Sequence, residues 1–481
     1  MSNYNRFYIR ILSPLHIGCD EVYEPMGFVV DESACELVSF DPFDFFRELP
    51  PLEKTKLADI CRKGTISSLL ELNKFMQSKK AHGYRIKLCH GFLEHYKQNI
   101  SMKPSNEFKI QQELNRFSIF RTAFHEHTNL PYIPGSSIKG ALRTAYLNAL
   151  AMKNKDVHYD NPKKNKYAAQ QLEKGLLNYA SLEKDPFRLL RVSDFVPVQA
   201  ETKIVYAVNE KKQPSKSPAR GPYQILEVIE PGAVFIGTIA TEDRYTKEAD
   251  IKRPLTMDAL LNSSLLFYGN EKQREDSELN AAGLPFLKAD KPDRAVPIRI
   301  GRHSGAESVT IDGHRDIRIM GNRGQSSFSK RGATTFWLAS EVQKSWKREQ
   351  LQPFGWAILG AITEEMYRSY EKTIQENRQR LQTAIQDNLV DAKSDSVRLS
   401  ARTAESKTIS VLSPLEKLLS ELKMINANDA GRIGTLIQKI EQLETVEDKA
   451  EIAAAIRSKL GEKAFKKHKR KDYLQSLLQE S

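Results

Sequence analysis

The amino-acid sequence predicts an α+β protein with antiparallel sheets and a helical C-terminal region. Strand-like and helical segments intermix along the chain without the regular strand–helix alternation of a doubly wound parallel sheet. Hydrophobic residues make up 40% of the 481 residues and charged residues 28%, which is typical of a globular protein with a sizeable core. After about residue 364 the chain contains no proline other than Pro414 and few aromatic residues, which favours helices there.

The first quarter of the chain reads as strands on either side of a helical stretch. Residues 6–12 alternate apolar and polar side chains, as a half-buried strand does. Residues 27–30 and 35–40 flank a short polar turn, as the two strands of a hairpin do. From residue 42 to about residue 77 the apolar residues take helical spacing, and residues 85–96 and 116–124 then return to strand-like patterns.

The middle of the chain contains five more strand-like segments, at residues 189–198, 202–208, 223–240, 295–300 and 333–340. A glycine-bounded turn over residues 301–305 follows the fourth of them. The polar segments 153–166 and 209–222 are rich in lysine, and we expect both to be exposed loops. The C-terminal helical region ends in six Lys or Arg residues between Lys463 and Lys471, either a solvated helix face or a second nucleic-acid contact.

The charge balance favours a polyanionic partner. Lys and Arg outnumber Asp and Glu by 73 to 61, which gives a net charge of +12. No apolar run approaches the roughly 20 residues that span a bilayer, and the N-terminus lacks the pattern of a signal peptide, so we expect a cytoplasmic protein with no membrane contact. The four cysteines form no CxxC pair, so neither a zinc ribbon nor a redox dithiol is indicated, and we expect no metal or cofactor.

The segment LPYIPGSSIKGALRTAYLNAL, residues 130–150, combines a turn with a helix. Gly135 and Gly140 are spaced as in the phosphate-binding loop of NTPases, but that loop continues with Lys and Ser or Thr. Here Ala141 and Leu142 follow, so neither the phosphate-binding amine nor the magnesium ligand is present. Ala141 and Leu142 therefore argue against an NTPase of that class.

The same segment has the features of an anion-binding helix start. Ser136 or Ser137 is expected to cap the helix, and apolar residues follow on one face at three- and four-residue spacing. Lys139 and Arg143 share another face near the N-terminus, where the helix dipole disfavours cations but attracts an anion. Gly140 inside the helix costs about 1 kcal/mol relative to alanine, which indicates close approach of another group. The alternative is a capped amphipathic helix with solvated cations.

The motif YIPGSSIKGALRTA resembles the signature of the RAMP superfamily, the RNA-binding proteins of CRISPR effector complexes. SPLHIG after the first strand, IRIGRHSG and PFGWAILG follow in the order that this family leads one to expect. Within the superfamily the chain is similar to the subunit of type III-A (Csm) complexes that caps the backbone at the crRNA 3′ end. The motifs lie within residues 7–360, and the segments 209–222 and 363–481 fall outside the resemblance.

The resemblance implies tandem ferredoxin-like (RRM-like) domains with helical insertions. We expect a first domain over 1–240, with an insertion at about 42–80 and the motif helix at 136–152. A second ferredoxin-like part with the glycine-rich loop is expected over 241–362, and a helical region over 363–481. The implied partners are crRNA, a neighbouring RAMP backbone subunit and the small helical subunit of the Csm complex, and contact with target RNA is left open.

The RNA-binding residues that the resemblance implies lie in the motif helix and in the glycine-bounded loop. They are Gly135, Ser136, Ser137, Lys139, Gly140, Arg143, Arg302 and His303. Tyr132 and Phe328 are candidates for stacking on bases, although each is more often a packing residue.

A nuclease of the same fold is the alternative function, a crRNA-processing endoribonuclease. RNA cleavage needs a general base and acid around a 2′-hydroxyl, and the candidates are His16, the HEH segment at 125–127 and His303. Each has a structural alternative: His16 as a loop anchor, HEH as a polar turn, and His303 as an RNA contact. None has an evident partner in the sequence, so we assign no catalytic residue and expect a non-catalytic RNA-binding scaffold.

Overall fold

The computed structural model forms two compact units, residues Met1–Asn388 and Leu389–Ser481. It describes residues 5–79, 81–102, 107–154, 166–213, 219, 221–242, 251–287, 295–320, 326–344, 348–379, 414–425, 430–443, 445–465, 468 and 470–479. Most of the lysine-rich segment expected as a loop at 153–166, residues 214–218 and 220 of the segment 209–222, and part of the basic C-terminal run lie outside these residues. Residues 209–211 belong to a strand, so the loop predicted there begins later than we expected. The domain boundaries expected near residues 240 and 363 stay predictions.

The first sheet of unit 1 is antiparallel and has β1 at its centre. Its order is β12 (Ala295–Arg299), β17 (Trp356–Ala361), β1 (Asn5–Ile11), β11 (Val234–Thr241) and β7 (Leu190–Val192), with β8 (Val196–Gln199) also paired to β11. Phe7, Ile9 and Ile11 alternate along β1 into the main core. Tyr8 faces the other side, where the helix over residues 364–379 packs on it. Both faces of this sheet are therefore covered.

The second sheet has nine strands and mixes parallel and antiparallel pairs. Its order is β2 (Gly18–Val22), β6 (Ile119–Thr122), β10 (Gln224–Ile229), β9 (Thr202–Lys211), β5 (Tyr84–Leu88), β4 (Glu36–Ser39) and β3 (Phe28–Asp31), and β15 (Thr335–Ser340) joins β9 and β16 (Gln352–Pro353). The pairs β10–β6 and β5–β9 are parallel. β13 (Ile317–Met320) and β14 (Ser326–Ser329) form a separate antiparallel pair within residues 315–332, which are rich in arginine and glycine.

Three stretches that we expected to be single strands are divided in the structure. Residues 189–198 form β7 and β8, which both pair with β11. Residues 223–240 form β10 and β11 in different sheets, because Pro231 and Gly232, the latter at a φ of 93°, turn the chain between them. Residues 85–96 form β5 and then the start of α4 (Phe92–Ile100), whose buried residues include Phe92, His95 and Tyr96 at helical spacing. The strand prediction for residues 92–96 was wrong because three- and four-residue spacing replaces alternation after Gly91.

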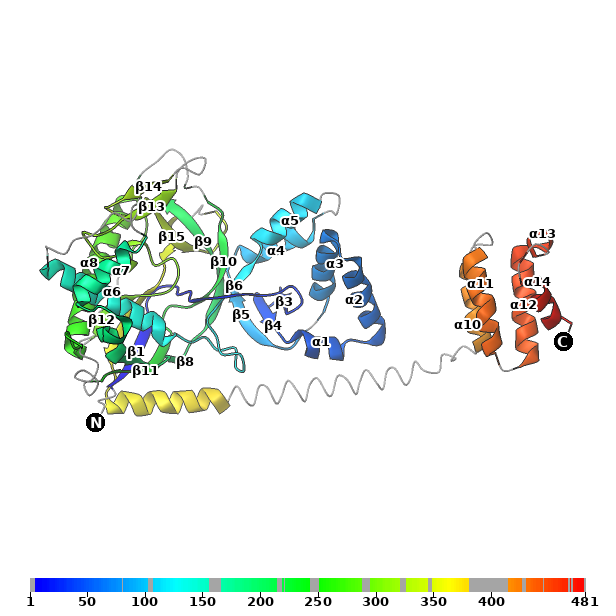
Figure 1. Cartoon of the computed structure of the whole chain (residues 1–481), viewed down its shortest axis with the longest axis horizontal. Coiled ribbons are helices and arrows are strands. Elements are labelled where there is room, and N and C mark those ends of the chain that lie inside the picture. Colours follow the sequence, from blue (N-terminus) through cyan, green and yellow to red (C-terminus); the bar gives the residue numbers. More distant parts are fainter. Residues whose placement is uncertain are drawn as a thin grey trace. The chain divides into compact units, whose positions relative to one another are not determined.

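The helices of unit 1 cover the sheets and form the predicted insertion, which is blue in Figure 1. They include α1 (Pro42–Glu48), α2 (Pro51–Lys63), α3 (Ile66–Gln77), α4, α5 (Glu107–Arg116), α6 (Gly135–Lys153), α7 (Ala168–Leu177) and α8 (Met257–Ala281). α6 and α8 pack against each other, and Tyr268 donates a hydrogen bond to the Ala141 carbonyl at 3.2 Å. The predicted α+β class is confirmed, and the architecture agrees with tandem ferredoxin-like domains.

Unit 2 is a small helical bundle with a core of its own. Its helices are α10 (Pro414–Met424), α11 (Ala430–Lys439), α12 (Val446–Leu460), α13 (Glu462–Phe465) and α14 (Lys471–Leu477). Leu436, Ile452 and Leu474 are among its buried residues.

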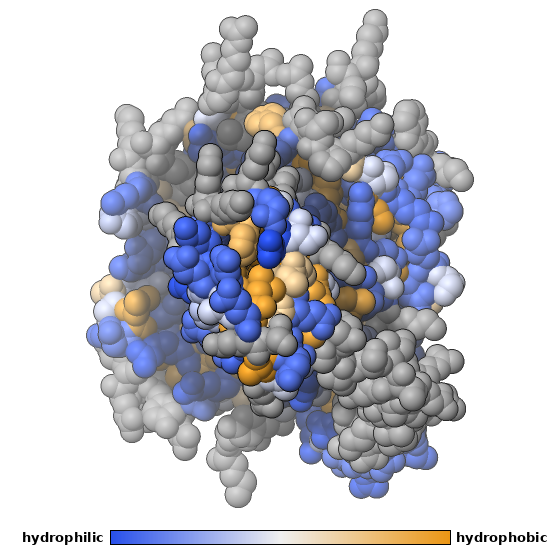
Figure 2. All heavy atoms as spheres, turned by 90° about the vertical axis from the view of Figure 1, so that its right-hand side faces the viewer, coloured by the Kyte–Doolittle hydropathy of each residue, from blue (hydrophilic) through white to orange (hydrophobic). Residues whose placement is uncertain are grey.

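The surface of the molecule is mixed in polarity. In the face shown in Figure 2, hydrophilic side chains surround smaller groups of hydrophobic ones. Among the described helices, none is long and apolar enough to cross a membrane.

Candidate nucleic-acid interface

α6 begins at Gly135, earlier than the sequence suggested. Neither Ser136 nor Ser137 caps it; instead the Asp194 carboxylate accepts a hydrogen bond from the Gly135 N–H at 2.8 Å. The predicted serine cap was therefore wrong, because a carboxylate 59 residues further along the chain occupies that role. Both serines lie in the first turn, and within the described residues their hydroxyls have no hydrogen-bond partner.

The two glycines of the motif serve different purposes. A Cβ at Gly135 would lie 2.4 Å from the Val192 carbonyl oxygen, so glycine lets the start of α6 contact the chain after β7. Gly140 is exposed, and a Cβ there would meet nothing within 4 Å in the described protein. Internal packing therefore does not explain a glycine inside this helix, and the open space suits an external group.

The glycine-bounded loop follows β12 and is anchored on the segment after β1. Gly301 and Gly305 take φ angles of 82° and 83°, which favour glycine. A Cβ at Gly301 would lie 2.5 Å from the His16 carbonyl oxygen. The N–H of Arg302 donates to that same oxygen at 2.8 Å. These contacts fix the position of the Arg302 backbone.

A cavity of about 410 Å³ lies between the start of α6 and this loop. Its lining includes Ser136, Ser137, Gly140 and Thr144 from α6, and Gly301, Arg302 and Ser304 from the loop. The structure thus brings together two motifs that are about 160 residues apart in the sequence. Hydroxyl groups, helix-terminal N–H groups and a guanidinium are the donors that bind phosphate oxygens.

Lys139 and Arg143 do not line this cavity in the structure. The Lys139 ammonium donates to the Leu190 carbonyl at 2.9 Å, and burial lowers its pKa. The Arg143 guanidinium forms ion pairs with Glu173 at 2.7 Å and with Asp185 at 2.9 Å. The cations that we expected to face a phosphate are therefore held by the protein itself, and their RNA contact stays a prediction.

Arg143→Ala is expected to lower the free energy of unfolding by about 1–3 kcal/mol. The substitution leaves the largely buried Asp185 carboxylate without a cation, and charge-assisted hydrogen bonds are worth about this much. Denaturant unfolding measures the change. Asp185→Asn together with Arg143→Ala should cost less than the sum of the two single variants, whereas full additivity would show that the pair is not coupled.

His303 lies on a different side of the loop from Arg302. Its Nε2 is 2.9 Å from the Gln224 Oε1, and its ring centroid is 4.5 Å from that of Trp337. Burial, with the nearby Arg302, lowers the pKa of His303 to about 3. The ring is therefore neutral near pH 7 and supplies no positive charge to a phosphate.

The other histidines have structural surroundings. His16 is fully buried, and its Nδ1 donates to the Glu227 carbonyl at 2.8 Å, so it anchors the loop after β1 to β10. His125 stacks on Tyr132 with ring centroids 4.6 Å apart in an exposed turn. Among the described residues, no group of three or more His, Cys, Asp or Glu side chains is placed to hold a metal ion.

His16 is expected to make the protein less stable in mild acid. Burial lowers its pKa from 6.5 to about 4 because the Nε2 has no hydrogen-bond partner and protonation would leave a charge inside the protein. The unfolded chain then binds the proton more readily, so the free energy of unfolding falls as the pH drops through this range. One such group adds at most about 1.4 kcal/mol per pH unit to the slope of the free energy of unfolding against pH.

Denaturant unfolding between pH 7 and pH 4 measures this dependence. In the variant His16→Asn, the free energy of unfolding should change less with pH than in the wild type, by nearly the contribution of one such group. His95 and His303 also have lowered pKa values, about 4 and about 3, so a residual slope is expected in the variant. Identical slopes in the two proteins would contradict the assignment to His16.

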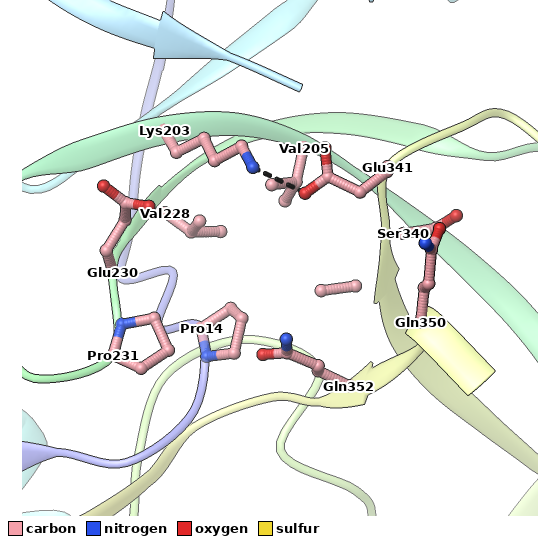
Figure 3. A pocket seen from close by; sticks show the side chains of 11 residues that line it. Pro14, Lys203, Val205, Val228, Glu230, Pro231, Ser340, Glu341, Gln350 and Gln352 are labelled. Atoms are coloured by element: carbon pink, nitrogen blue, oxygen red, sulfur yellow. Dashed lines mark hydrogen bonds and ion pairs between the residues drawn. The ribbon is translucent and has the colours of Figure 1, made fainter. Parts of the chain in front are cut away.

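Another cavity, on the second sheet, has a composition that does not suit phosphate. Figure 3 shows Glu230 and Glu341 on its walls, with Pro14 and Pro231 beside them. Lys203 pairs with Glu341 at 2.5 Å. Because carboxylates repel phosphate and the nearby lysine is already paired, we do not place RNA there.

A buried charge cluster that sequence reasoning missed joins the end of β12, two residues before the loop, to α8. Arg299, the last residue of β12, pairs with Glu275 of α8 at 2.6 Å, and the Trp356 indole donates to the same carboxylate at 2.7 Å. Residues 257–281 form α8, and no element was predicted there. Thr256, which caps α8, and the long run without proline are the signals that would have found this helix.

Comparison with known proteins agrees with the motifs. Residues 8–302 match the family model of the RAMP superfamily, which is more than half of the chain. The chain is 27% identical over 206 residues to the CRISPR system Cms protein Csm5 of Methanocaldococcus jannaschii, a match that covers 41% of this chain and 44% of that relative. The matched region thus spans less than half the length of this curated relative.

Two solved structures also match this chain. A chain of the Csm–crRNA–target RNA ternary complex of a type III-A CRISPR-Cas system matches with a TM-score of 0.47 and 18% identity over 74% of this chain and 100% of that one. The crystal structure of T. onnurineus Csm5 matches with a TM-score of 0.46 and 16% identity over 73% and 99% of the two chains. On the family match over residues 8–302, this chain belongs to the RAMP superfamily.

Proposed function

We propose that this protein is a crRNA-binding structural subunit of a type III-A CRISPR ribonucleoprotein. It caps the backbone at the crRNA 3′ end and supports crRNA maturation in antiviral defence. Membership of the RAMP superfamily and the similarity to a protein named Csm5 support this proposal. Its partners are the crRNA, a neighbouring RAMP backbone subunit and the small helical subunit of the complex.

The cavity between α6 and the glycine-bounded loop is the observation that carries the proposal. Ser136 and Ser137 contribute hydroxyl groups from the first turn of α6, and Arg302 contributes a guanidinium from the opposite wall. The Ser137 N–H is already bound to the Pro134 carbonyl at 2.9 Å, so the hydroxyls are the donors that we assign to the ligand. The missing side chain at Gly140 lets the sugar–phosphate backbone approach the helix. We assign Ser136, Ser137, Gly140 and Arg302 to RNA contact, and Arg143 to the support of α6.

The proposed role is non-catalytic. Cleavage next to a 2′-hydroxyl needs a base and an acid on either side of one reacting phosphate. His16 is fully buried, and His303 is held by Gln224 away from the wall that carries Arg302. Neither is placed to act on a phosphate in the proposed cavity.

Sequencing of the RNA that co-purifies with the protein from its host tests the proposal. Short RNAs with a common repeat-derived 5′ end are expected, and random RNA or none would contradict it. The nuclease alternative would be correct if the folded wild type cut RNA at a defined position and His16→Ala or His125→Ala abolished the cut. A contaminating nuclease would survive either substitution.

Arg302→Ala is expected to reduce the salt dependence of RNA binding. Each lost phosphate contact on a single strand lowers the slope of log affinity against log salt concentration by about 0.7. Arg302 is exposed, so the variant should keep the stability of the wild type. Titration of a fluorescent single-stranded RNA at several salt concentrations measures the slope, and an unchanged slope would remove Arg302 from the interface.

A further inference from the structure

A second cavity, of about 660 Å³, adjoins the candidate RNA site. The two cavities share Arg299, Gly301, Ser304 and Val309 in their linings, so the glycine-bounded loop is the wall between them. Val309 lies at this shared boundary and is 61% exposed. A strand bound on one side of the loop is therefore within reach of the other side.

The second cavity has a preformed aromatic wall made of His303 and Trp337. Their ring centroids are 4.5 Å apart, and Gln224 fixes the imidazole by a hydrogen bond at 2.9 Å. Both residues are half-buried, so part of this wall stays accessible. His303 takes a φ of 64°, a strained conformation for a residue with a side chain, and such strain is concentrated at functional sites.

The charges around this cavity favour a neutral ligand next to an anion. Lys212 pairs with Glu307 at 2.5 Å and Arg299 pairs with Glu275 at 2.6 Å, so these buried charges balance each other. Arg318 on β13 also lines the cavity and forms no ion pair within the described residues. A flat, neutral, hydrogen-bonding group with a phosphate beside it matches this lining, and a nucleotide of a single strand has that composition.

We propose that this cavity receives one unstacked nucleobase of the bound RNA strand, with the His303–Trp337 wall as its stacking surface. The inference rests on the proposed RNA-binding function, because the strand that crosses the loop at Arg302 supplies the base. His303 then contacts RNA through a base and not through a phosphate. Stacking on aromatic side chains tolerates any base, so the site selects an unpaired nucleotide and not a sequence.

Binding of single-stranded RNAs that each carry one abasic position tests the inference in the full-length protein. For wild type, one abasic position should weaken binding roughly tenfold or more, which is the usual effect of losing one stacked base. Trp337→Leu and His303→Asn should weaken binding of the intact RNA to a similar degree, with no further loss on the abasic RNA. Asparagine tolerates a positive φ, so His303→Asn keeps the loop conformation. Trp337→Phe keeps an aromatic surface and should lose least.

The outcomes separate this inference from the function on which it rests. The inference is overturned if wild type binds RNA, Arg302→Ala lowers the salt slope, and both wall variants keep wild-type affinity. The same conclusion follows if free adenosine monophosphate binds the cavity as tightly as the RNA does, because the base would then not come from the strand. If the wild type binds no single-stranded RNA, the proposed function itself fails.

Discussion

Glu275→Ala is expected to lower the free energy of unfolding by about 3–5 kcal/mol, the usual cost of leaving one member of a buried ion pair without its partner. Arg299 and Glu275 are 3% and 4% exposed, and their charged groups lie 2.6 Å apart. The substitution leaves the Arg299 guanidinium without its carboxylate partner and removes the acceptor of the Trp356 indole N–H. Because Arg299 lies two residues before the glycine-bounded loop, RNA affinity should fall as well.

Two control variants separate charge from packing at this position. Glu275→Gln keeps a hydrogen-bond acceptor for Trp356 and a side chain of the same size, so it should destabilise less than alanine. Arg299→Met combined with Glu275→Leu removes both charges, and its cost should be far below the sum of the two single variants. Denaturant unfolding measures all of them, and a loss below about 1 kcal/mol for Glu275→Ala would contradict the proposed support of the loop.

The same cluster explains why sequence reasoning overlooked α8. Helical periodicity is recognised when the buried face is apolar, but the buried face of α8 includes Ser263, Ser264, Glu271 and Glu275. The two carboxylates have partners beyond the helix: Arg299 pairs with Glu275, and Arg315 pairs with Glu271. A buried carboxylate becomes understandable only when the arginine that neutralises it is known, and that knowledge requires the tertiary structure.

Some features of the candidate site depend only on neighbouring residues in the sequence, and others depend on residues far along the chain. The start of α6 and the loop at Gly301 could be predicted because glycine, serine and proline act on the neighbouring backbone. The partners of Arg143 could not, since Glu173 and Asp185 lie 30 and 42 residues further along the chain. The sequence also placed Arg302 and His303 together, whereas the positive φ of His303 turns the two side chains toward different cavities.

Gly140→Ala is expected to stabilise the free protein and to weaken its binding to RNA. Alanine gains about 1 kcal/mol over glycine inside a helix, and nothing within 4 Å opposes the new methyl group. That methyl group would project into the cavity between α6 and the loop, where we place the RNA backbone. Gly140→Glu adds length and negative charge, so it should reduce RNA affinity roughly tenfold to a hundredfold, as expected when a charge-assisted hydrogen bond is lost and an anion faces a phosphate.

Gly269 in α8 provides a matched control. It is also a helical glycine at which an added methyl group would meet nothing within 4 Å, but it does not line the cavity beside Arg302. Gly269→Ala should therefore raise the free energy of unfolding by a similar amount and leave RNA affinity unchanged. Thermal or denaturant unfolding gives the stability of each variant, and titration with single-stranded RNA gives its affinity. If Gly140→Ala and Gly269→Ala bound RNA equally well, no RNA backbone would pass over Gly140, and the strand would have to cross the loop without touching the helix.

The other outcome is that Gly140→Ala raises the free energy of unfolding and lowers RNA affinity, while Gly269→Ala changes only the free energy of unfolding. That result would show that the glycine at position 140 serves the ligand, although it makes the helix less stable.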